Sequence, residues 1–356
     1  KAPPVTGYAN IVNSLNSCLN KKRINTTYFS TVPSLFSKLF PSRKWKVLRF
    51  LYLLVIIPFI VFLIPLHKCI YININGGAGL FFDIVLTCFS RLMRKQIYLH
   101  HNSYSYLNRN HFIARHLFKI ASIHSTHVVN SLSMKDCLIK QYKGVSIVKV
   151  ISNAAILTID NPDYFSSSLP SLEQKTQDKM TFGFMGYMDD QKGIDLFCET
   201  ISYLISKGIS LTAIAVGPVH NKLFFNNIKD KFSSIVEFKE PVYGSDFDLF
   251  FQEVDILLFP SKYKNEAEPL TVYHALNAGV PVLSTQVGCL KNMMDECKYC
   301  DSFSELTYKE HVLRYIENNI AINMNRQTLR EAVSLNYQNT NDKKINQFDH
   351  FISSIK

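Results

Sequence analysis

The sequence predicts an α/β protein with two successive Rossmann-like domains. Three observations support this prediction: the apolar content of a long chain, an alternation of apolar runs with helical stretches that occurs twice, and a polar segment between the two series. With 356 residues and 47% hydrophobic content, the chain can bury two cores of ordinary size. We expect domains at residues 1–155 and 156–344, with ligands bound in a cleft between their sheet edges.

The first series of strands starts at residue 69. Short runs rich in Ile and Val alternate with helical stretches, which is typical of a parallel sheet. The expected strands are 69–75, 96–101, 127–131 and 145–152, and the expected helices are 80–95 and 112–122. The glycines between the first strand and helix lack a complete G-x-G-x-x-G spacing, so we interpret them as tight turns rather than as a nicotinamide site.

The second series follows a Ser-rich polar stretch at 156–180, which we interpret as a linker. The expected strands are 181–186, 211–217, 235–238, 254–260 and 281–285, and helices are expected from Ile194, near Leu223 and from Leu270. Helices follow residue 309, with a polar break expected at 336–344. The last helix, 345–356, has regularly spaced apolar residues and is expected to pack on the first domain.

Positive charge is concentrated in the first half of the chain. Residues 1–150 hold about twenty Lys and Arg against two acids, Asp83 and Asp136, although the net charge of the whole chain is only +11. This asymmetry indicates an anionic partner, either nucleic acid or an acidic membrane surface; a basic face without a partner is the alternative. Basic and aromatic residues are not interleaved as a nucleic-acid stacking platform requires, which favours the membrane.

One apolar stretch, Phe50–Leu66, is near the lower length limit for a membrane span. Pro58 and Pro65 argue against spanning, and basic residues precede the stretch. We expect a helix of the first domain that dips into the interface of the bilayer. A fully buried helix and a true span are the alternatives.

The cysteines and acids give no strong metal signal. Eight cysteines are scattered without a framework, so free thiols in a reduced cytosolic setting are expected, and the lone C-x-x-C at Cys297 and Cys300 is more often two free thiols than a zinc site. The pair Asp246 and Asp248 suits helix capping better than a cation. No metal and no cofactor are expected. The chain opens without Met on a Pro-rich turn and a helix, so a strand is expected ahead of Lys1.

Two loops after strands of the second domain carry charged residues. Lys192 follows the strand that ends near Gly186 and precedes a helix, where a diphosphate could meet an ammonium group and helix amides. The segment from Phe259 presents Glu266, and then Pro269 opens a helix whose first amides, at Leu270 and Thr271, could hold a phosphate. A solvated loop lysine would be the simpler interpretation of Lys192 alone.

Together these two segments resemble the C-terminal domain of the retaining GT-B glycosyltransferases of family 4, whose signature is E-x7-E. Glu266 matches the first acid, Pro269 and Leu270 match the family's P-L pair, and His274 stands in place of the second acid. The resemblance implies that Glu266 orients the donor sugar and that His274 faces the nucleotide ribose. Tyr187 replaces an arginine that many members carry, so diphosphate binding is expected to depend more on Lys192.

The first domain resembles the same family. Gly7 lies in a Pro-Pro-x-x-Gly segment like the loop that approaches the donor or acceptor, and His100 and His101 lie in a segment like the His-containing loop near the reacting sugar. Residues 151–154 resemble the entry to the second domain. The resemblance implies catalytic roles for His100, His101 and Glu266, and donor binding by Gly7, Lys192, Glu266, Pro269, Leu270, Thr271 and His274.

The implied function is transfer of a sugar, with retention, from a nucleotide-diphosphate sugar to a polyprenyl-diphosphate-linked glycan in O-antigen or capsule synthesis. The implied location is cytoplasmic, peripheral on the inner face of the cell membrane, with an anionic membrane surface and no nucleic acid as partner. Two other interpretations remain open: a GT-B nucleotide-sugar epimerase, and a non-catalytic GT-B-like partner that docks assembly enzymes at the membrane.

Overall fold

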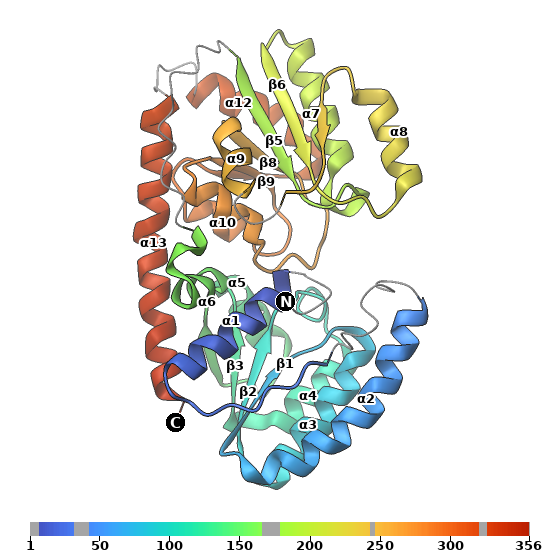
Figure 1. The fold of residues 1–356 in the computed structure, drawn as a ribbon, viewed down its shortest axis with the longest axis vertical. Helices are drawn as coiled ribbons and strands as arrows, with labels where there is room; N and C mark the ends of the chain where they lie inside the picture. Colours follow the sequence, from blue (N-terminus) through green and yellow to red (C-terminus); the bar gives the residue numbers. More distant parts are fainter. Residues whose placement is uncertain (1–6, 32–42, 166–178, 243–245, 320–325, 356) are drawn as a thin grey trace. The chain divides into compact units, whose positions relative to one another are not determined.

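The structure, a computed structural model, describes residues 7–31, 43–165, 179–242, 246–319 and 326–355 (Figure 1). The chain forms two compact units: Lys1–Pro162 with Lys344–Lys356, and Asp163–Lys343. Each unit is built around its own parallel sheet, as the sequence predicts. The sequence places the division after residue 155, whereas the units divide after Pro162.

The first unit holds a four-stranded parallel sheet in the order β1-β2-β3-β4. Figure 1 shows α2, α3 and α4 on one side of this sheet and α1 and α6 on the other. Its elements are α1 (Gly7–Lys21), α2 (Arg43–Leu63), β1 (Cys69–Asn73), α3 (Leu80–Leu92), β2 (Gln96–His101), α4 (Phe112–Ala121), β3 (Ser125–Val129), α5 (Leu132–Gln141), β4 (Ile147–Val150) and α6 (Asn153–Asp160).

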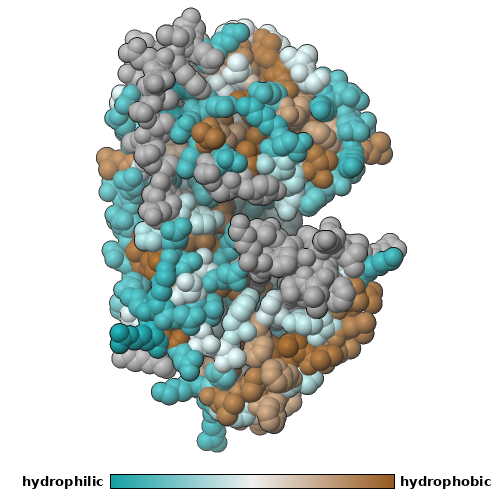
Figure 2. All heavy atoms as spheres, in the orientation of Figure 1, coloured by the Kyte–Doolittle hydropathy of each residue, from teal (hydrophilic) through white to brown (hydrophobic). Residues whose placement is uncertain are grey.

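Helix α2 leaves much of its apolar surface uncovered. The stretch Lys44–Leu66 is long and apolar enough to cross a membrane, yet only 17% of its most apolar window is buried. The helix packs on α3 through contacts such as the edge-on pair Phe50 and Phe82, whose ring centroids are 5.7 Å apart. The alternative of a fully buried helix is therefore wrong, while docking at the bilayer interface stays a prediction. Apolar residues gather over the region of α2 and α3 in Figure 2.

The second unit holds a six-stranded parallel sheet in the order β10-β9-β8-β5-β6-β7. Its elements are β5 (Met180–Met185), α7 (Ile194–Ser206), β6 (Leu211–Val216), α8 (Lys222–Phe232), β7 (Glu237–Lys239), α9 (Asp246–Glu253), β8 (Ile256–Phe259), α10 (Leu270–Asn277), β9 (Val282–Thr285), α11 (Leu290–Asp295), β10 (Asp301–Phe303), α12 (Tyr308–Asn319) and the first part of α13 (Arg326–Ser354).

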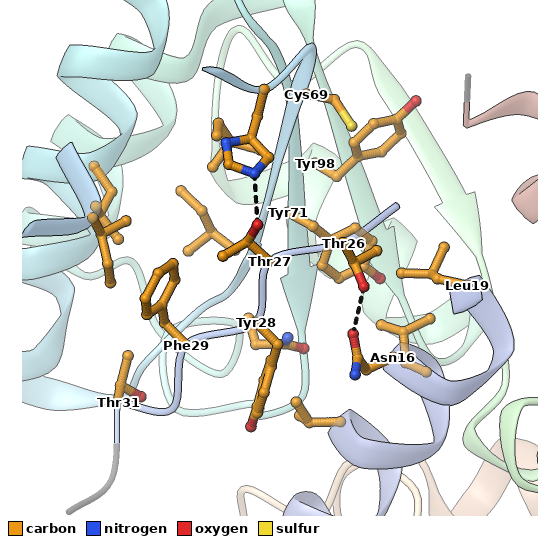
Figure 3. A pocket seen from close by; sticks show the side chains of 18 of the residues that line it. Asn16, Leu19, Thr26, Thr27, Tyr28, Phe29, Thr31, Cys69, Tyr71 and Tyr98 are labelled. Carbon is orange, nitrogen blue, oxygen red and sulfur yellow. Dashed lines mark hydrogen bonds between the residues drawn. The ribbon is translucent and has the colours of Figure 1, made fainter. Parts of the chain in front are cut away.

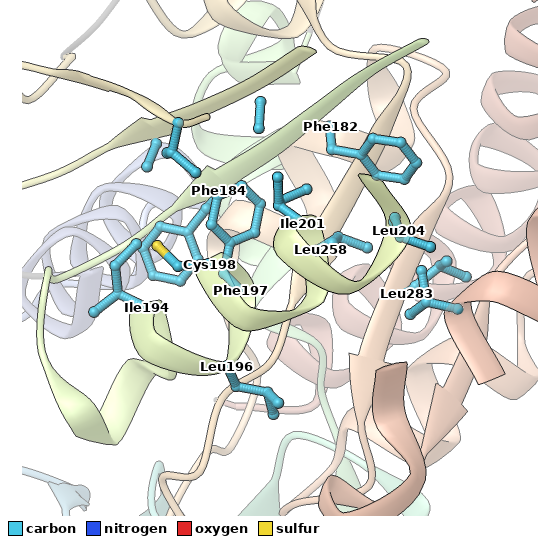
Figure 4. Close-up of a cluster of buried hydrophobic side chains, with 14 of the residues drawn as sticks. Phe182, Phe184, Ile194, Leu196, Phe197, Cys198, Ile201, Leu204, Leu258 and Leu283 are labelled. Atoms are coloured by element: carbon cyan, nitrogen blue, oxygen red, sulfur yellow. The ribbon is translucent and has the colours of Figure 1, made fainter. Parts of the chain in front are cut away.

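The core of the second unit lies between this sheet and the helices that cover it. Phe182 and Phe184 of β5 point onto α7, where Phe197 and Ile201 are fully buried (Figure 4). Alternate residues of a strand face the same side of the sheet, so these two phenylalanines act together. This core fixes β5 and α7 and thereby the loop that joins them.

Two sequence predictions about segment boundaries are wrong. Residues 156–160 do not belong to a linker, because Ile156 and Leu157 are fully buried in α6, which packs on α1; residues 166–178 lie outside the described residues. The polar break at 336–344 is also absent, since α13 continues through it. Its polar side chains are tolerated because one face of the helix is covered, with Tyr337 only 6% exposed.

The end of α13 belongs to the first unit from Lys344 onward. Phe348, Phe351 and Ile352 are buried there, and the ring of Phe351 meets that of Tyr98 on β2 edge-on at 5.9 Å. The apolar spacing that the sequence shows at 345–356 is thus used for packing on the first unit's sheet.

Candidate functional site

The strand order of the second unit defines a switch point. The chain enters the sheet at β5, proceeds outward to β6 and β7, and then returns to β8 on the other side of β5. In open parallel sheets, ligands bind beyond the carboxyl ends of the two strands where the order reverses. Lys192 follows β5 and Glu266 follows β8, so the sheet places both predicted residues at this point.

Lys192 and Glu266 form an ion pair there. The Lys192 Nζ lies 2.6 Å from Oε2 of Glu266, and Ser261 donates a second hydrogen bond to the same oxygen at 3.0 Å. The Lys192 ammonium also lies 5.4 Å from the centroid of the Tyr263 ring. The lysine side chain keeps 23% of its surface exposed and the glutamate 9%. The pair is therefore held by protein contacts but open to solvent on the lysine side.

Two glycines allow the backbone to approach closely enough for this pair. Gly193 has φ +76°, and a Cβ there would lie 1.9 Å from the carbonyl oxygen of Pro260. Gly288, with φ +56°, brings the loop after β9 against the carbonyl oxygen of Glu266, which accepts from the amide of Cys289 at 3.2 Å. Only glycine adopts these conformations at so little cost. Three loops are thus packed around the ion pair.

The loop that carries Lys192 is further tied to the one that carries Glu266 by Lys262. Its ammonium contacts Asp195 at 2.6 Å and Asp190 at 3.1 Å, and its amide donates to the Gln191 carbonyl at 2.9 Å. Partial burial lowers the pKa of Lys262, but hydrogen bonds to Asp195 and Asp190 outweigh it and raise the pKa overall. Lys262 therefore positions the loops, while Lys192 has one carboxylate partner at the site.

The helix after Glu266 begins one residue later than the sequence predicts. Pro269 is the N-cap of α10, with φ −71° and ψ 123°, rather than its first helical residue. Leu270 and Thr271 therefore provide the first two amides of an eight-residue helix, and such amides have no acceptor within their own helix. These amides lie at the positive end of the helix dipole, which favours the binding of an anion.

His274 lies among aromatic rings. Its ring stacks on Phe247 with centroids 4.8 Å apart and planes 3° from parallel, and Tyr164 lies at 5.4 Å on a tilted plane. Burial lowers the pKa of His274 to about 4, so it is neutral at pH 7. A glutamate at this position would have to enter an aromatic surrounding, which explains why a neutral ring suits this chain. Its predicted contact with a ribose stays a prediction.

Glu268, the other acid in the loop before α10, has a different role from Glu266. Glu268 is buried and accepts a hydrogen bond from the hydroxyl of Tyr273, which is itself 2% exposed.

Ser261 was not singled out from the sequence, although a hydroxyl residue directly after a buried strand is a usable signal. Tyr187 lies with its ring 4.2 Å from that of His220, on planes tilted by 34°, at the carboxyl ends of β5 and β6.

The predicted histidines of the first unit end β2 on opposite faces of the sheet and are fully buried. The Nδ1 of His100 lies 3.0 Å from the hydroxyl of Tyr71, and its Nε2 lies 3.1 Å from Oδ1 of Asn130. Burial lowers the pKa of His100 to about 4, although the hydrogen bond that its Nε2 donates to Oδ1 of Asn130 opposes this. The ring is a neutral hydrogen-bonding group at the carboxyl end of the sheet.

His101 belongs to an interior cluster. Its Nε2 lies 2.9 Å from Nδ1 of His127, its Nδ1 lies 3.1 Å from the hydroxyl of Tyr106, and Phe118 covers the rings. Burial, with the neighbouring imidazoles, lowers the pKa of His101 well below its ordinary value. With both ring nitrogens paired inside the protein, His101 packs within this cluster, and its predicted direct role in catalysis has no support in this geometry.

The remaining predictions concern Gly7 and metals. Gly7 is the first residue of α1, and residues 1–6 of the Pro-Pro segment lie outside the described residues. Asp246 and Asp248 occupy the first turn of α9, where acids favour the helix dipole. Among the described residues, no three His, Cys, Asp or Glu side chains are grouped so as to hold a metal ion.

Comparison with known proteins finds a family model that matches part of the second unit. Residues 179–308 match the family model described as glycosyl transferases group 1. This range contains Lys192, Glu266 and the start of α10. A search of curated proteins finds no match in sequence.

Solved structures resemble the whole chain. Anabaena HepE in complex with UDP superposes with a TM-score of 0.70 at 14% identity, covering 99% of this chain and 98% of that one. The same protein with UDP-glucose gives 0.63 at 14% identity, covering 99% and 97%. Sucrose-phosphate synthase from Thermosynechococcus elongatus gives 0.58 at 13% identity, covering 81% and 74%. The chain therefore has the GT-B fold, with two parallel-sheet α/β domains.

Proposed function

We propose that this chain is a GT-B glycosyltransferase that moves a sugar, with retention, from a nucleotide-diphosphate sugar to a lipid-linked oligosaccharide. The single observation that carries the proposal is the Lys192–Glu266 pair at the switch point of a glycosyl transferases group 1 domain, beside the first amides of α10. Lys192 and these amides stabilise the charge that develops on the leaving diphosphate, and Glu266 accepts hydrogen bonds from sugar hydroxyls.

The chemistry of the pair supports a donor that carries phosphate and sugar together. An ammonium group suits the diphosphate, whereas the carboxylate 2.6 Å away would repel it and must instead face a group that donates hydrogen bonds. A nucleotide-diphosphate sugar presents both kinds of group next to each other. HepE, which shares the fold, is seen with UDP and with UDP-glucose, and this supports the same donor class here.

The first unit supports a lipid-linked acceptor. Its exposed apolar residues on α2 and α3, called here the α2–α3 face, would enter the bilayer interface, and nearby exposed basic residues would meet acidic head groups. The α2–α3 face comprises Val47, Phe50, Leu51, Leu54, Val55, Phe59, Phe62, Phe81, Val85, Phe89 and Leu92. Exposed apolar patches of this size on a protein of this type mark interaction sites. The proposed location is accordingly the cytoplasmic leaflet, in O-antigen or capsule synthesis.

The test is a transfer assay with matched lysine variants. Wild type, Lys192→Ala and Lys207→Ala are incubated with UDP-, GDP- and dTDP-sugars and polyprenyl-diphosphate glycans, and products are weighed by mass spectrometry. Lys207 is exposed at the far end of α7, beside Tyr203, so it serves as the control. We expect a one-sugar gain with one donor, lost in Lys192→Ala and kept in Lys207→Ala.

The anomeric configuration of the product, measured by NMR, tests retention; inversion would contradict that part of the proposal. Conversion of the donor sugar without any acceptor would instead favour an epimerase. Absence of both transfer and nucleotide binding in folded wild type that still binds vesicles would favour the non-catalytic docking partner.

A further inference from the structure

The first unit contains a cavity of about 300 Å³ that the donor chemistry does not use. It lies between α1, the end of α2, β1 and the irregular segment 24–31 (Figure 3). Its lining is mostly apolar and includes Leu15, Leu19, Ile60, Leu63, Ile72 and Leu86. An apolar cavity of roughly 150 Å³ admits benzene, so this volume suits a chain of about a dozen carbons.

The segment 24–31 forms one wall of the cavity without helix or strand. It is held by side-chain bonds instead: Thr26 to Asn16 at 2.9 Å, Thr27 to His67 at 2.9 Å, and the carbonyl of Ser30 to the Tyr52 hydroxyl at 2.9 Å. Figure 3 shows the first two of these contacts beside Tyr28 and Phe29. A wall tied by a few side-chain bonds can shift to admit a ligand at lower cost than a helix or strand can.

The cavity and the surface expected at the membrane lie on two sides of the same helix, α2. Ile60 and Leu63 line it from the last turns of α2, while Phe59 and Phe62 on the same turns are 52% and 78% exposed. One helix therefore separates the cavity from the α2–α3 face. A hydrocarbon chain in the bilayer beside α2 would therefore be one helix away from this cavity.

Positive charge lies next to the cavity. Arg49 donates to the carbonyl of Thr31 at 3.3 Å and to Oδ1 of Asn75 at 2.7 Å, and both residues line the cavity. Asp83, an acid that also lines the cavity, accepts from the amide of Asn75 at 2.8 Å and from its side chain at 2.7 Å, and burial raises its pKa to about 7. An acidic head group would therefore meet the guanidinium at this end.

We propose that this cavity receives the hydrocarbon chain of an anionic membrane lipid, with its phosphate beside Arg49. This rests on the proposed function, because the lipid-linked acceptor is the ligand of that chemistry which the enzyme must hold. The same chemistry could come from an ordinary phospholipid, and the arms of the experiment separate the two sources. Holding the first part of the chain would fix the position of the acceptor's diphosphate relative to the first unit.

The cavity contains its own reporter, the free thiol of Cys69. Cys69 on β1 lines the cavity and is half-buried, and Cys137 on α5 is half-buried but outside the lining. Burial raises the pKa of both thiols, so each cysteine is compared with its own rate of alkylation in the absence of lipid. The rate of alkylation by N-ethylmaleimide is measured at each cysteine by peptide mass spectrometry, with the full chain in detergent-free buffer.

We expect farnesyl phosphate to slow alkylation of Cys69 about tenfold and to leave Cys137 unchanged, while inorganic phosphate protects neither. Protection by farnesyl phosphate but not by dodecyl phosphate assigns the site to the prenyl acceptor. Protection by dodecyl phosphate alone assigns it to a phospholipid chain. If no chain protects Cys69, or if Cys137 is protected equally, the proposal is overturned.

A cavity-filling variant gives a second test. Ile60→Trp would occupy the cavity, and Ile56→Trp, one turn earlier on α2 at a half-buried position outside the lining, is the control. We expect the first to abolish protection of Cys69 and the second to preserve it, with circular dichroism confirming that both fold. Protection retained in Ile60→Trp would contradict the proposal. UDP binding is measured in parallel, because loss of donor binding with Cys69 protection intact would count against the proposed function alone.

Discussion

The carboxyl ends of the two sheets use opposite kinds of polar group. In the first unit, His100 and His101 are fully buried, neutral and hydrogen-bonded to other uncharged side chains. In the second unit, Lys192 and Glu266 are a charged pair whose lysine remains partly exposed. Neutral side chains that are already hydrogen-bonded have few groups left for a ligand, and those suit hydroxyl groups. A charged pair with a partly exposed lysine can bind a diphosphate. The difference favours the second unit as the place where the donor diphosphate binds.

The largest effect is expected at Glu266. Replacing it with Ala removes the acceptor for sugar hydroxyls and leaves the Lys192 ammonium without its carboxylate, so transfer should fall about 100- to 1000-fold, as for loss of a preorganised group. The measurement is kcat/KM for the donor that the transfer assay identifies. Glu310→Ala, at an exposed position on α12, is the control. If Glu266→Ala keeps kcat/KM within tenfold of wild type, the Lys192–Glu266 pair has a structural role rather than a role in transfer.

The next largest effect concerns the surfaces of the two units. Val55 and Phe62 on the α2–α3 face are 75% and 78% exposed, and Leu223 on α8 of the second unit is 76% exposed. Replacing both Val55 and Phe62 with Asp should weaken binding to acidic vesicles about 100-fold, since each buried apolar side chain contributes roughly 1.5 kcal/mol or more.

The matched substitution Leu223→Asp should leave vesicle binding unchanged, as measured by co-sedimentation. Equal losses in both proteins would show that the apolar surface of the first unit has no special role at the membrane. Unchanged binding in the double variant would contradict docking through α2.

The contrast between the units also appears in how well the sequence predicts them. The strand 96–101 and the start of α7 are predicted to the residue, and the start of α10 to within one residue, because alternating apolar runs and a Pro after a polar loop are local signals. The strand β10 was missed since it has only three residues and no apolar run. The helical character of 156–160 was missed because α6 is stabilised by packing on α1, which no local pattern shows.

The residues of the candidate site show the same difference between features that local sequence signals predict and features that depend on packing. Lys192 and Glu266 lie 74 residues apart, and the two loops could be paired from sequence because both follow strands of one parallel sheet. The stacking of His274 on Phe247 could not, since it depends on where α9 lies relative to α10. The burial of His101 was also not predictable, because a histidine at a strand end points to solvent or core according to what covers the sheet.

A smaller effect, on stability, tests directly whether the buried histidines of the first unit are neutral. Burial lowers the pKa of His127 to about 4 from the ordinary 6.5. The unfolded chain then binds a proton between these values that the folded protein does not, so stability is present above pH 6.5 and is lost as the pH falls toward 4. From pH 7 to 5 this costs about 2 kcal/mol for each such histidine.

His127→Gln keeps a hydrogen-bonding side chain but cannot titrate. The loss of unfolding free energy between pH 7 and 5, measured by urea denaturation, should therefore shrink by about 2 kcal/mol. Asp83 acts in the opposite direction: burial raises its pKa to about 7, although Asn75 and Arg49 oppose this, so it favours the folded state on acidification. Asp83→Asn should accordingly steepen the loss of stability at acid pH. An unchanged pH dependence in His127→Gln would contradict a buried, neutral His127.

The smallest effect separates the two acids of one loop. Glu268 accepts from the buried hydroxyl of Tyr273, whereas Glu266 pairs with the partly exposed Lys192. Tyr273→Phe removes one buried hydrogen bond and should lower the free energy of unfolding by about 1 kcal/mol while changing kcat/KM less than twofold. Because the ring and its packing are kept, any larger loss of transfer would have to come through Glu268 itself. That outcome would make Glu268, which contacts Tyr273, part of the donor site together with Glu266.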